Sequence, residues 1–147
     1  MAILKALFGS SQKADTPINP YWQRSVNMKY MPLFTVARKP EMLQGREGVF
    51  IIWGTNRVGW IYCGYHKDMA RAVDLAANSY KILECKHPDA TLCFSWAIIR
   101  SDAQAGVVKY LRQELSFAVS DPDLDEIFGM SPSAIAMSNP IAVLPPG

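Results

Sequence analysis

The chain has 147 residues, enough for one domain with a hydrophobic core; half of them are hydrophobic and 19% are charged, as is ordinary for a soluble globular protein. No apolar stretch approaches the ~18 residues of a membrane span, and the opening segment 1–8 is too short, with Lys5 inside it, for a signal peptide. Three cysteines without a secretory signal favour a reducing compartment, so we expect a cytosolic protein.

The net charge of +2 is unevenly distributed along the chain. Thirteen Lys and Arg stand against seven Asp and Glu through residue 100, and two stand against six after it, which gives +6 and −4. A basic face on the first part would suit a phosphate backbone. An ordinary solvated surface is the other interpretation, because no dense Lys/Arg cluster occurs.

The N-terminal residues have the pattern of a short amphipathic helix. Over residues 2–8 the apolar side chains recur at helical spacing, which predicts a segment that docks on a partner or a membrane surface, or one that folds back on its own domain. The stretch from Gly9 to Pro20 is rich in Ser, Thr, Asn and Pro and is interpreted as a linker.

Aromatic and basic residues alternate between Tyr21 and Lys39. They are Tyr21, Trp22, Tyr30 and Phe34, with Arg24, Lys29, Arg38 and Lys39 between and after them. Single-stranded nucleic-acid binders use this mixture for base stacking and phosphate contact. A structural cover is the alternative: an irregular arm across the core, with Leu33 to Ala37 as an edge strand and a helical turn over 40–45.

The clearest structural signal begins at Gly48. Six apolar residues through Trp53 predict a strand buried on both faces, and a turn over 54–59 leads to a second strand over 60–63. From His66 or Lys67 the apolar residues recur at helical spacing as far as Tyr80. The unit is therefore predicted to be strand, turn, strand, helix.

The rest of the chain adds one strand and more helices. We expect a loop or short strand over 81–86, a strand over 91–99, a helix over 101–118, a short helix from Pro122 within the acidic stretch 121–128, and a tail over 131–147 that is a strap or a docking peptide. The predicted fold is α+β, a small mixed or antiparallel sheet of about three strands flanked by helices, with an N-terminal arm (1–47), a core (48–118) and a C-terminal arm (119–147).

The strand pair carries the residues of a known motif. Gly48-Val49-Phe50 opens the first strand and Tyr62-Cys63-Gly64 closes the second, and this arrangement resembles the GIY-YIG nuclease superfamily over residues 48–118. The resemblance implies a small sheet that carries a site for metal-assisted phosphodiester hydrolysis. In that family two motif tyrosines and a helical arginine handle the nucleophile and the phosphate, and a later glutamate binds a divalent metal.

Several of the positions that the resemblance makes catalytic hold other residue types. Phe50 replaces the first tyrosine, the arginine position falls on Ala72, and Val108, which cannot bind a hard cation, stands where the glutamate belongs. Tyr62 matches the second tyrosine, while Arg71 is one step early and is expected in solvent, about 160° from the helix's apolar stripe. These replacements favour a non-catalytic module that binds nucleic acid or a protein partner.

Other roles stay open for particular residues. An active endonuclease with relocated groups would use Tyr62 and Arg71, with Mg or Mn on Glu84 or Glu114. A nucleic-acid module would use Arg57, His66, Lys67 and Arg71, with Gly48, Phe50, Tyr62 and Gly64 as structural motif residues. Cys63, His66, Cys85 and His87 form a possible zinc set; the alternative is buried free thiols and surface histidines, and for the binding module we expect no cofactor.

Overall fold

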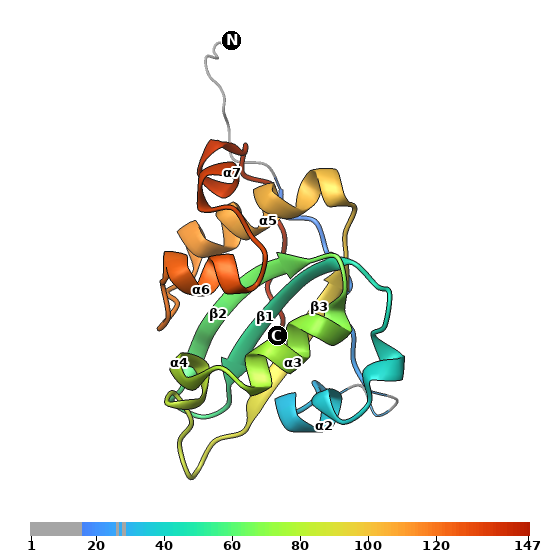
Figure 1. Cartoon of the computed structure of the whole chain (residues 1–147), viewed down its shortest axis with the longest axis vertical. Coiled ribbons are helices and arrows are strands. Elements are labelled where there is room, and N and C mark those ends of the chain that lie inside the picture. The colour runs from blue at the N-terminus through green and yellow to red at the C-terminus, as the bar shows by residue number, and fades with distance from the viewer. Residues whose placement is uncertain (1–15, 26, 28) are drawn as a thin grey trace.

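The computed structural model describes residues 16–25, 27 and 29–147, so the helix expected over residues 2–8 lies outside the described residues. A three-stranded antiparallel sheet with strand order β2-β1-β3 is flanked by helices, which confirms the predicted α+β fold (Figure 1). The strands are β1 (Gly48–Gly54), β2 (Gly59–His66) and β3 (Leu92–Ile98). The helices are α2 (Leu33–Ala37), η1 (Pro40–Met42, a 3-10 turn), α3 (Met69–Ala77), α4 (Tyr80–Leu83), α5 (Ser101–Glu114), α6 (Pro122–Ile127) and α7 (Pro132–Met137).

Strand β1 is central and is buried on both faces, as its apolar run predicts. At the first residue of β1, the backbone of β3 approaches so closely that only glycine fits. A Cβ atom on Gly48 would lie 2.0 Å from the carbonyl oxygen of Ala97. The turn to β2 contains Asn56 at a φ of 59° and Gly59 at 72°, so the predicted hairpin closes through two residues in the left-handed region.

The strand register assigns the large side chains to the two faces of the sheet. Phe50 pairs with Trp96, and Ile52 pairs with both Tyr62 and Phe94, so these five residues share one face. On the opposite face Trp53 lies across from Cys93, and its indole nitrogen donates to Ser95 Oγ at 3.0 Å. Both faces are covered, since α3 and α5 pack on β2 and α2 packs on β3.

Irregular segments from both ends of the chain cover the two edges of the sheet. Along β2, the backbone N–H groups of Ala118 and Val119 donate to the carbonyls of Trp60 and Ile61. Along β3, the N–H of Phe94 donates to Met31, and the N–H of Gln23 donates to Trp96. These bonds satisfy ladder groups that would otherwise be free to pair with another chain.

Short polar residues cap several of the helices. The side chain of Asp68 accepts from the N–H of Ala70 at the start of α3, and Ser79 does the same for α4. Asp121 caps α6, which begins at Pro122 as predicted, because proline is favoured in the first helical turn.

Four local predictions are wrong. Residues 33–37 form helix α2 instead of an edge strand, because Leu33 and Val36 are buried at helical spacing. The stretch expected as loop or strand over 81–86 contains most of helix α4, and Tyr80, at the start of that helix, is 78% exposed instead of continuing the stripe of α3. Helix α5 ends at Glu114, four residues early, because the chain then straightens and pairs with β2.

The C-terminal tail is a strap, with a helix that its sequence did not predict. After α7 the chain runs extended, Val143 is buried, and a parallel bridge joins it to Ile18. Within the described part of the chain, no helix is long and apolar enough to cross a membrane.

Candidate functional site: a closed motif centre and an open arm surface

The motif tyrosine, Tyr62, belongs to a buried hydrogen-bond network. Its hydroxyl donates to Asp125 Oδ1 at 2.6 Å. The guanidinium of Arg112 holds both oxygens of Asp125, at 3.0 and 2.9 Å, and also donates to the carbonyl of Cys63 at 2.7 Å. The network therefore joins strand β2 to helices α5 and α6.

Burial sets the protonation of the groups in this network. Burial first, and then the hydrogen bond to Asp125, raises the pKa of Tyr62 well above its usual value of 10. Burial also raises the pKa of the Cys63 thiol to about 12. Both groups therefore stay neutral near pH 7, and the phenol of Tyr62 is occupied as a donor.

Phe128 and Met130, which follow α6, cover the same face of the sheet. The ring of Phe128, just after α6, lies 5.2 Å from the rings of both Phe50 and Tyr62. A Cβ atom on Gly64 would lie 2.6 Å from the Met130 side chain, so this motif glycine leaves room for the cover. The two motif positions Phe50 and Tyr62 are therefore packed and buried.

The structure does not gather the catalytic candidates. Ala72 and Val108 are fully buried. Arg71 is exposed, as predicted, and pairs with Asp74 at 3.0 Å. Glu84, just after α4, and Glu114, the last residue of α5, are both exposed, and no described contact joins either of them to Tyr62 or Arg71.

Metal-binding arrangements are absent from the part of the chain that the structure describes. Over residues 16–25, 27 and 29–147, no three His, Cys, Asp or Glu side chains lie close enough to hold a metal ion. Of the proposed zinc set, Cys63 is buried in β2, whereas Cys85 and His87 follow α4.

The residues predicted to bind nucleic acid lie at opposite ends of the hairpin. Arg57 is in the turn, whereas His66 pairs with Gly48 at the far end of β1, about 20 Å away along the strands. His66 Nδ1 accepts from the N–H of Asp68, and burial lowers the pKa of His66 below its usual value. The histidine is therefore neutral near pH 7 and adds no charge to Lys67.

A wide hollow of about 860 Å³ lies at the turn end of the sheet. Arg57, Lys86 and His87 line it, together with the carboxylates of Glu84 and Asp89. The two acids offset the two cations, so the hollow does not select for an anion.

Three smaller hollows with no acidic lining residue lie along the N-terminal arm. Their volumes are about 470, 500 and 330 Å³, and each shares lining residues with the other two, so they form one surface. We call this the arm surface; it comprises Asn19, Tyr21–Ser25, Lys29–Pro32, Thr35, Val36, Lys39, Met42, Arg46 and Trp96, with Leu144, Pro145 and Gly147 of the tail.

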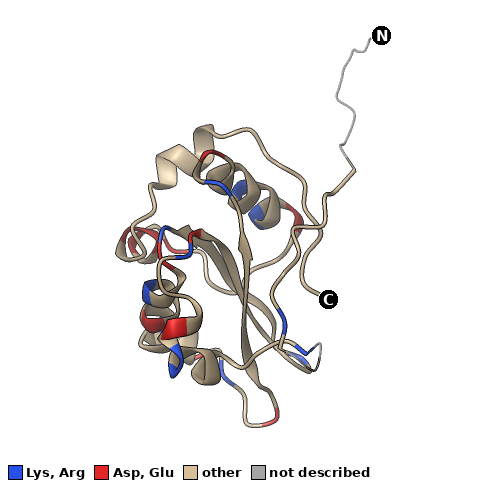
Figure 2. Cartoon of the chain, turned by 90° about the vertical axis from the view of Figure 1, so that its right-hand side faces the viewer, with Lys and Arg blue, Asp and Glu red and all other residues tan. Residues whose placement is uncertain are grey.

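Four cations line the arm surface, all of them within the described residues 16–25, 27 and 29–147. Arg24, Lys29, Lys39 and Arg46 line the hollows, and no salt bridge within the described residues involves any of them. In Figure 2, the irregular part of the N-terminal arm runs beside the C-terminal end of the chain. Basic positions are coloured on it, with no acidic position next to them. The arm surface can therefore attract an anionic polymer.

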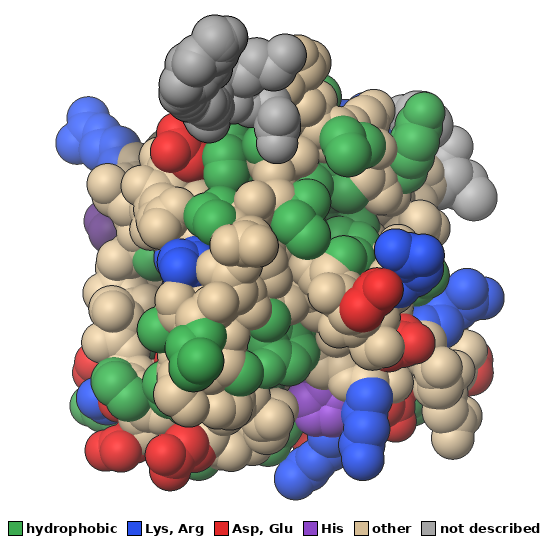
Figure 3. All heavy atoms as spheres, turned by 90° about the horizontal axis from the view of Figure 1, so that it is seen from above, with side chains coloured by type: hydrophobic (Ala, Val, Ile, Leu, Met, Phe, Trp, Pro, Cys, Tyr) green, Lys and Arg blue, Asp and Glu red, His purple; other side chains and the backbone are tan. Residues whose placement is uncertain are grey.

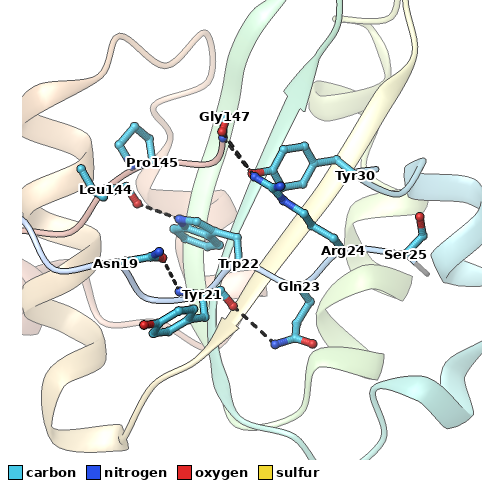
Figure 4. A pocket seen from close by; sticks show the side chains of 10 residues that line it. All are labelled: Asn19, Tyr21, Trp22, Gln23, Arg24, Ser25, Tyr30, Leu144, Pro145 and Gly147. Atoms are coloured by element: carbon cyan, nitrogen blue, oxygen red, sulfur yellow. Dashed lines mark hydrogen bonds between the residues drawn. The ribbon is translucent and has the colours of Figure 1, made fainter. Parts of the chain in front are cut away.

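Tyr21 presents an exposed ring in a strained backbone conformation. Its φ is +60°, which is uncommon for a residue with a side chain, and its N–H donates to Asn19 Oδ1 at 2.8 Å. The Gln23 side chain donates to the Tyr21 carbonyl, so polar neighbours hold the turn on both sides (Figure 4). The ring is 75% exposed and is available to stack on a flat partner.

The residues of the arm divide between the core and the solvent. Trp22 and Leu33 are buried and belong to the hydrophobic core, whereas Tyr21 and Arg24 face solvent. Sequence reasoning did not include Arg46, which follows the predicted helical turn and reaches the arm surface only because the chain folds back there. Its only sequence signal is a basic residue outside any apolar pattern.

A different, apolar surface lies at the end of the molecule that carries α5 and α7. Hydrophobic side chains gather on it (Figure 3), and Met137 of α7 is 86% exposed. On neighbouring α6, Ile127 is 62% exposed.

Comparisons of this chain with protein-family models, curated proteins and solved structures gave no match. Function is therefore inferred from the geometry of the described residues.

Proposed function

We propose that the chain is a GIY-YIG-like scaffold without catalysis that binds single-stranded nucleic acid along the arm surface. The observation that carries the proposal is the arm surface itself: four cations that form no salt bridge among the described residues line its hollows, and the exposed Tyr21 shares one hollow with Arg24. Cations bind the phosphates, and aromatic rings stack on the bases.

The motif centre supports a binding role rather than a catalytic one. The Tyr62 hydroxyl is committed to Asp125, and Phe128 packs where a substrate would have to reach Phe50. A general acid or base has to lie within hydrogen-bond reach of a substrate proton, and this phenol is 1% exposed.

The shape of the arm surface favours a single strand over a duplex. The rings stand on an irregular segment beside hollows of 330–500 Å³, which suit separate splayed bases. In a duplex the base faces are stacked on each other, so Tyr21 would have no partner.

The sequence also predicts a protein partner as the alternative to nucleic acid. The strongest support for a protein partner is the apolar surface around Met137 and Ile127. No pattern of charges or hydrogen-bonding groups on that surface indicates what would bind it, whereas the arm surface offers both cations and rings. We therefore place the binding function on the arm.

The test compares two equally exposed tyrosines. Binding of labelled single-stranded DNA and RNA of about 12 nucleotides is measured by fluorescence anisotropy for wild type, Tyr21→Ala and Tyr80→Ala. Tyr21 is 75% and Tyr80 78% exposed, but Tyr80 lies on α4, outside the arm surface. We expect Tyr21→Ala to lose about tenfold in affinity, the scale of one stacked base, and Tyr80→Ala to bind like wild type.

Equal losses in the two variants, or no binding by the wild type, would contradict the proposal. The same mixtures are incubated with Mg or Mn, and separately with chelator, and are then separated on a gel. Metal-dependent cleavage that Arg71→Ala abolishes would instead establish the endonuclease alternative.

A further inference from the structure

The C-terminal tail lies across the arm surface and contacts its polar groups. Gly147 donates its backbone N–H to the Tyr30 hydroxyl at 2.9 Å, and its carbonyl accepts from Arg24 at 3.4 Å. The indole nitrogen of Trp22 donates to the Leu144 carbonyl at 2.7 Å. Figure 4 shows Trp22 facing Leu144, and Arg24 and Tyr30 meeting at Gly147.

The tail is held firmly up to Leu144 and less firmly beyond it. Ile18 exchanges backbone hydrogen bonds with Ala142 and Leu144, at 3.0 and 2.9 Å, and Val143 is buried. Past Leu144, Pro145 and Gly147 are exposed and Pro146 is buried, and the only hydrogen bonds within the described residues are those of Gly147 with Arg24 and Tyr30. Displacing the last three residues therefore breaks two hydrogen bonds and exposes one buried proline.

We propose that Pro145–Gly147 is a built-in competitor that shields Arg24 and Tyr30 of the arm surface and is displaced when a single-stranded nucleic acid binds. This inference rests on the proposed function. The tail contacts the groups that a single-stranded nucleic acid would use. The guanidinium of Arg24 lies 4.6 Å from the centre of the Tyr30 ring in a cation–π contact, so a cation for a phosphate and a ring for a base lie side by side. The Gly147 oxygen that accepts from Arg24 lies at the long distance of 3.4 Å, whereas a phosphate can bind a guanidinium through two charged oxygens at shorter distances.

The experiment compares the full chain with a chain that ends at Leu144. This truncation keeps both Ile18 hydrogen bonds and the Trp22 contact, removes no charged side chain, and moves the terminal carboxylate from Gly147 to Leu144, so the net charge is unchanged. Affinity for labelled oligo(dT) and oligo(rU) is measured for both chains, with the melting temperature of each as a control for folding. We expect the truncated chain to bind about fivefold more tightly. This is the effect of about one hydrogen bond, which the full chain has to break before the nucleic acid can bind and the truncated chain does not.

A second measurement uses the intact chain and needs no truncation. The backbone amide signal of Gly147 is followed by NMR while oligo(dT) is added. We expect it to move to the position of an unstructured residue, because binding breaks its hydrogen bond to the Tyr30 hydroxyl.

The outcomes separate this inference from the function on which it rests. If both chains bind equally and the Gly147 signal does not move, or if truncation weakens binding, the tail is not a competitor, while nucleic-acid binding by the arm stands. If neither chain binds, the proposed function fails and the inference fails with it. If the truncated chain does not fold, the Gly147 signal of the intact chain decides.

Discussion

Asp125 is the residue on which the buried network depends. Its side chain is 5% exposed and it accepts from both Tyr62 and Arg112, whereas Arg112 keeps a second acceptor in the carbonyl of Cys63. We expect Asp125→Asn to lower the free energy of unfolding by about 2–4 kcal/mol, because the guanidinium then faces a neutral amide in a partly buried site. Tyr62→Phe should cost only about 1 kcal/mol, since the pair of Asp125 with Arg112 survives.

Urea denaturation of the two variants measures the difference. Equal losses would contradict the central role of the carboxylate and would place the energy in the Tyr62 hydroxyl. The sequence could not have predicted this network, because Tyr62 and Asp125 are 63 positions apart and Asp125 lies in a stretch with the composition of an acidic surface. The one local hint was Arg112, placed four residues after Val108 and therefore beside the buried stripe of α5.

At the scale of elements, the contact between α5 and the tail depends on one glycine. A Cβ atom on Gly106 would lie 2.5 Å from the Asn139 carbonyl oxygen and 3.0 Å from the Ile141 side chain. We expect Gly106→Ala to destabilise the protein by about 1–2 kcal/mol in urea denaturation, because overpacking against the strap outweighs the helix propensity that alanine adds.

Gln113→Ala is the matched control for this substitution, because it adds the same residue to an exposed position of the same helix. It should change stability by less than about 0.5 kcal/mol. If Gly106→Ala were instead as stable as wild type or more so, the strap would not pack on α5 as described.

The elements that sequence reasoning predicted correctly are those whose signal is local. The run from Gly48 to Trp53, the hairpin turn and the strand over 92–98 carry their patterns within a few residues. The stretch 33–37 failed because five apolar and β-branched residues suit a strand or a buried helix equally, and only packing against β3 decides. The boundary after Ala77 was missed because Ser79 caps a new helix while the apolar spacing continues to Tyr80.

At the scale of the whole molecule, the positive charge of the first hundred residues is divided between two separate places. Sequence reasoning offered both places for nucleic-acid binding, the aromatic and basic stretch Tyr21–Lys39 and the set Arg57, His66, Lys67 and Arg71. In the fold Arg57 lies apart from the rest of that set, and Arg71 pairs with Asp74. The arm surface contains Arg24, Lys29 and Lys39 of the Tyr21–Lys39 stretch and adds Arg46, which the stretch does not include.

Two double substitutions with the same change in net charge distinguish the two locations. Lys39→Gln with Arg46→Gln alters the arm surface, whereas Arg57→Gln with Arg71→Gln alters the other predicted set, and each lowers the net charge from +2 to 0. The affinity for single-stranded DNA is measured over a salt series. We expect the slope of log K against log salt to become shallower by roughly 1.4 in the arm variant, about 0.7 for each cation that no longer neutralises a phosphate, and to stay near the wild-type slope in the other. The reverse result would move the binding site to the ends of the hairpin, and equal changes would show that only the net charge matters.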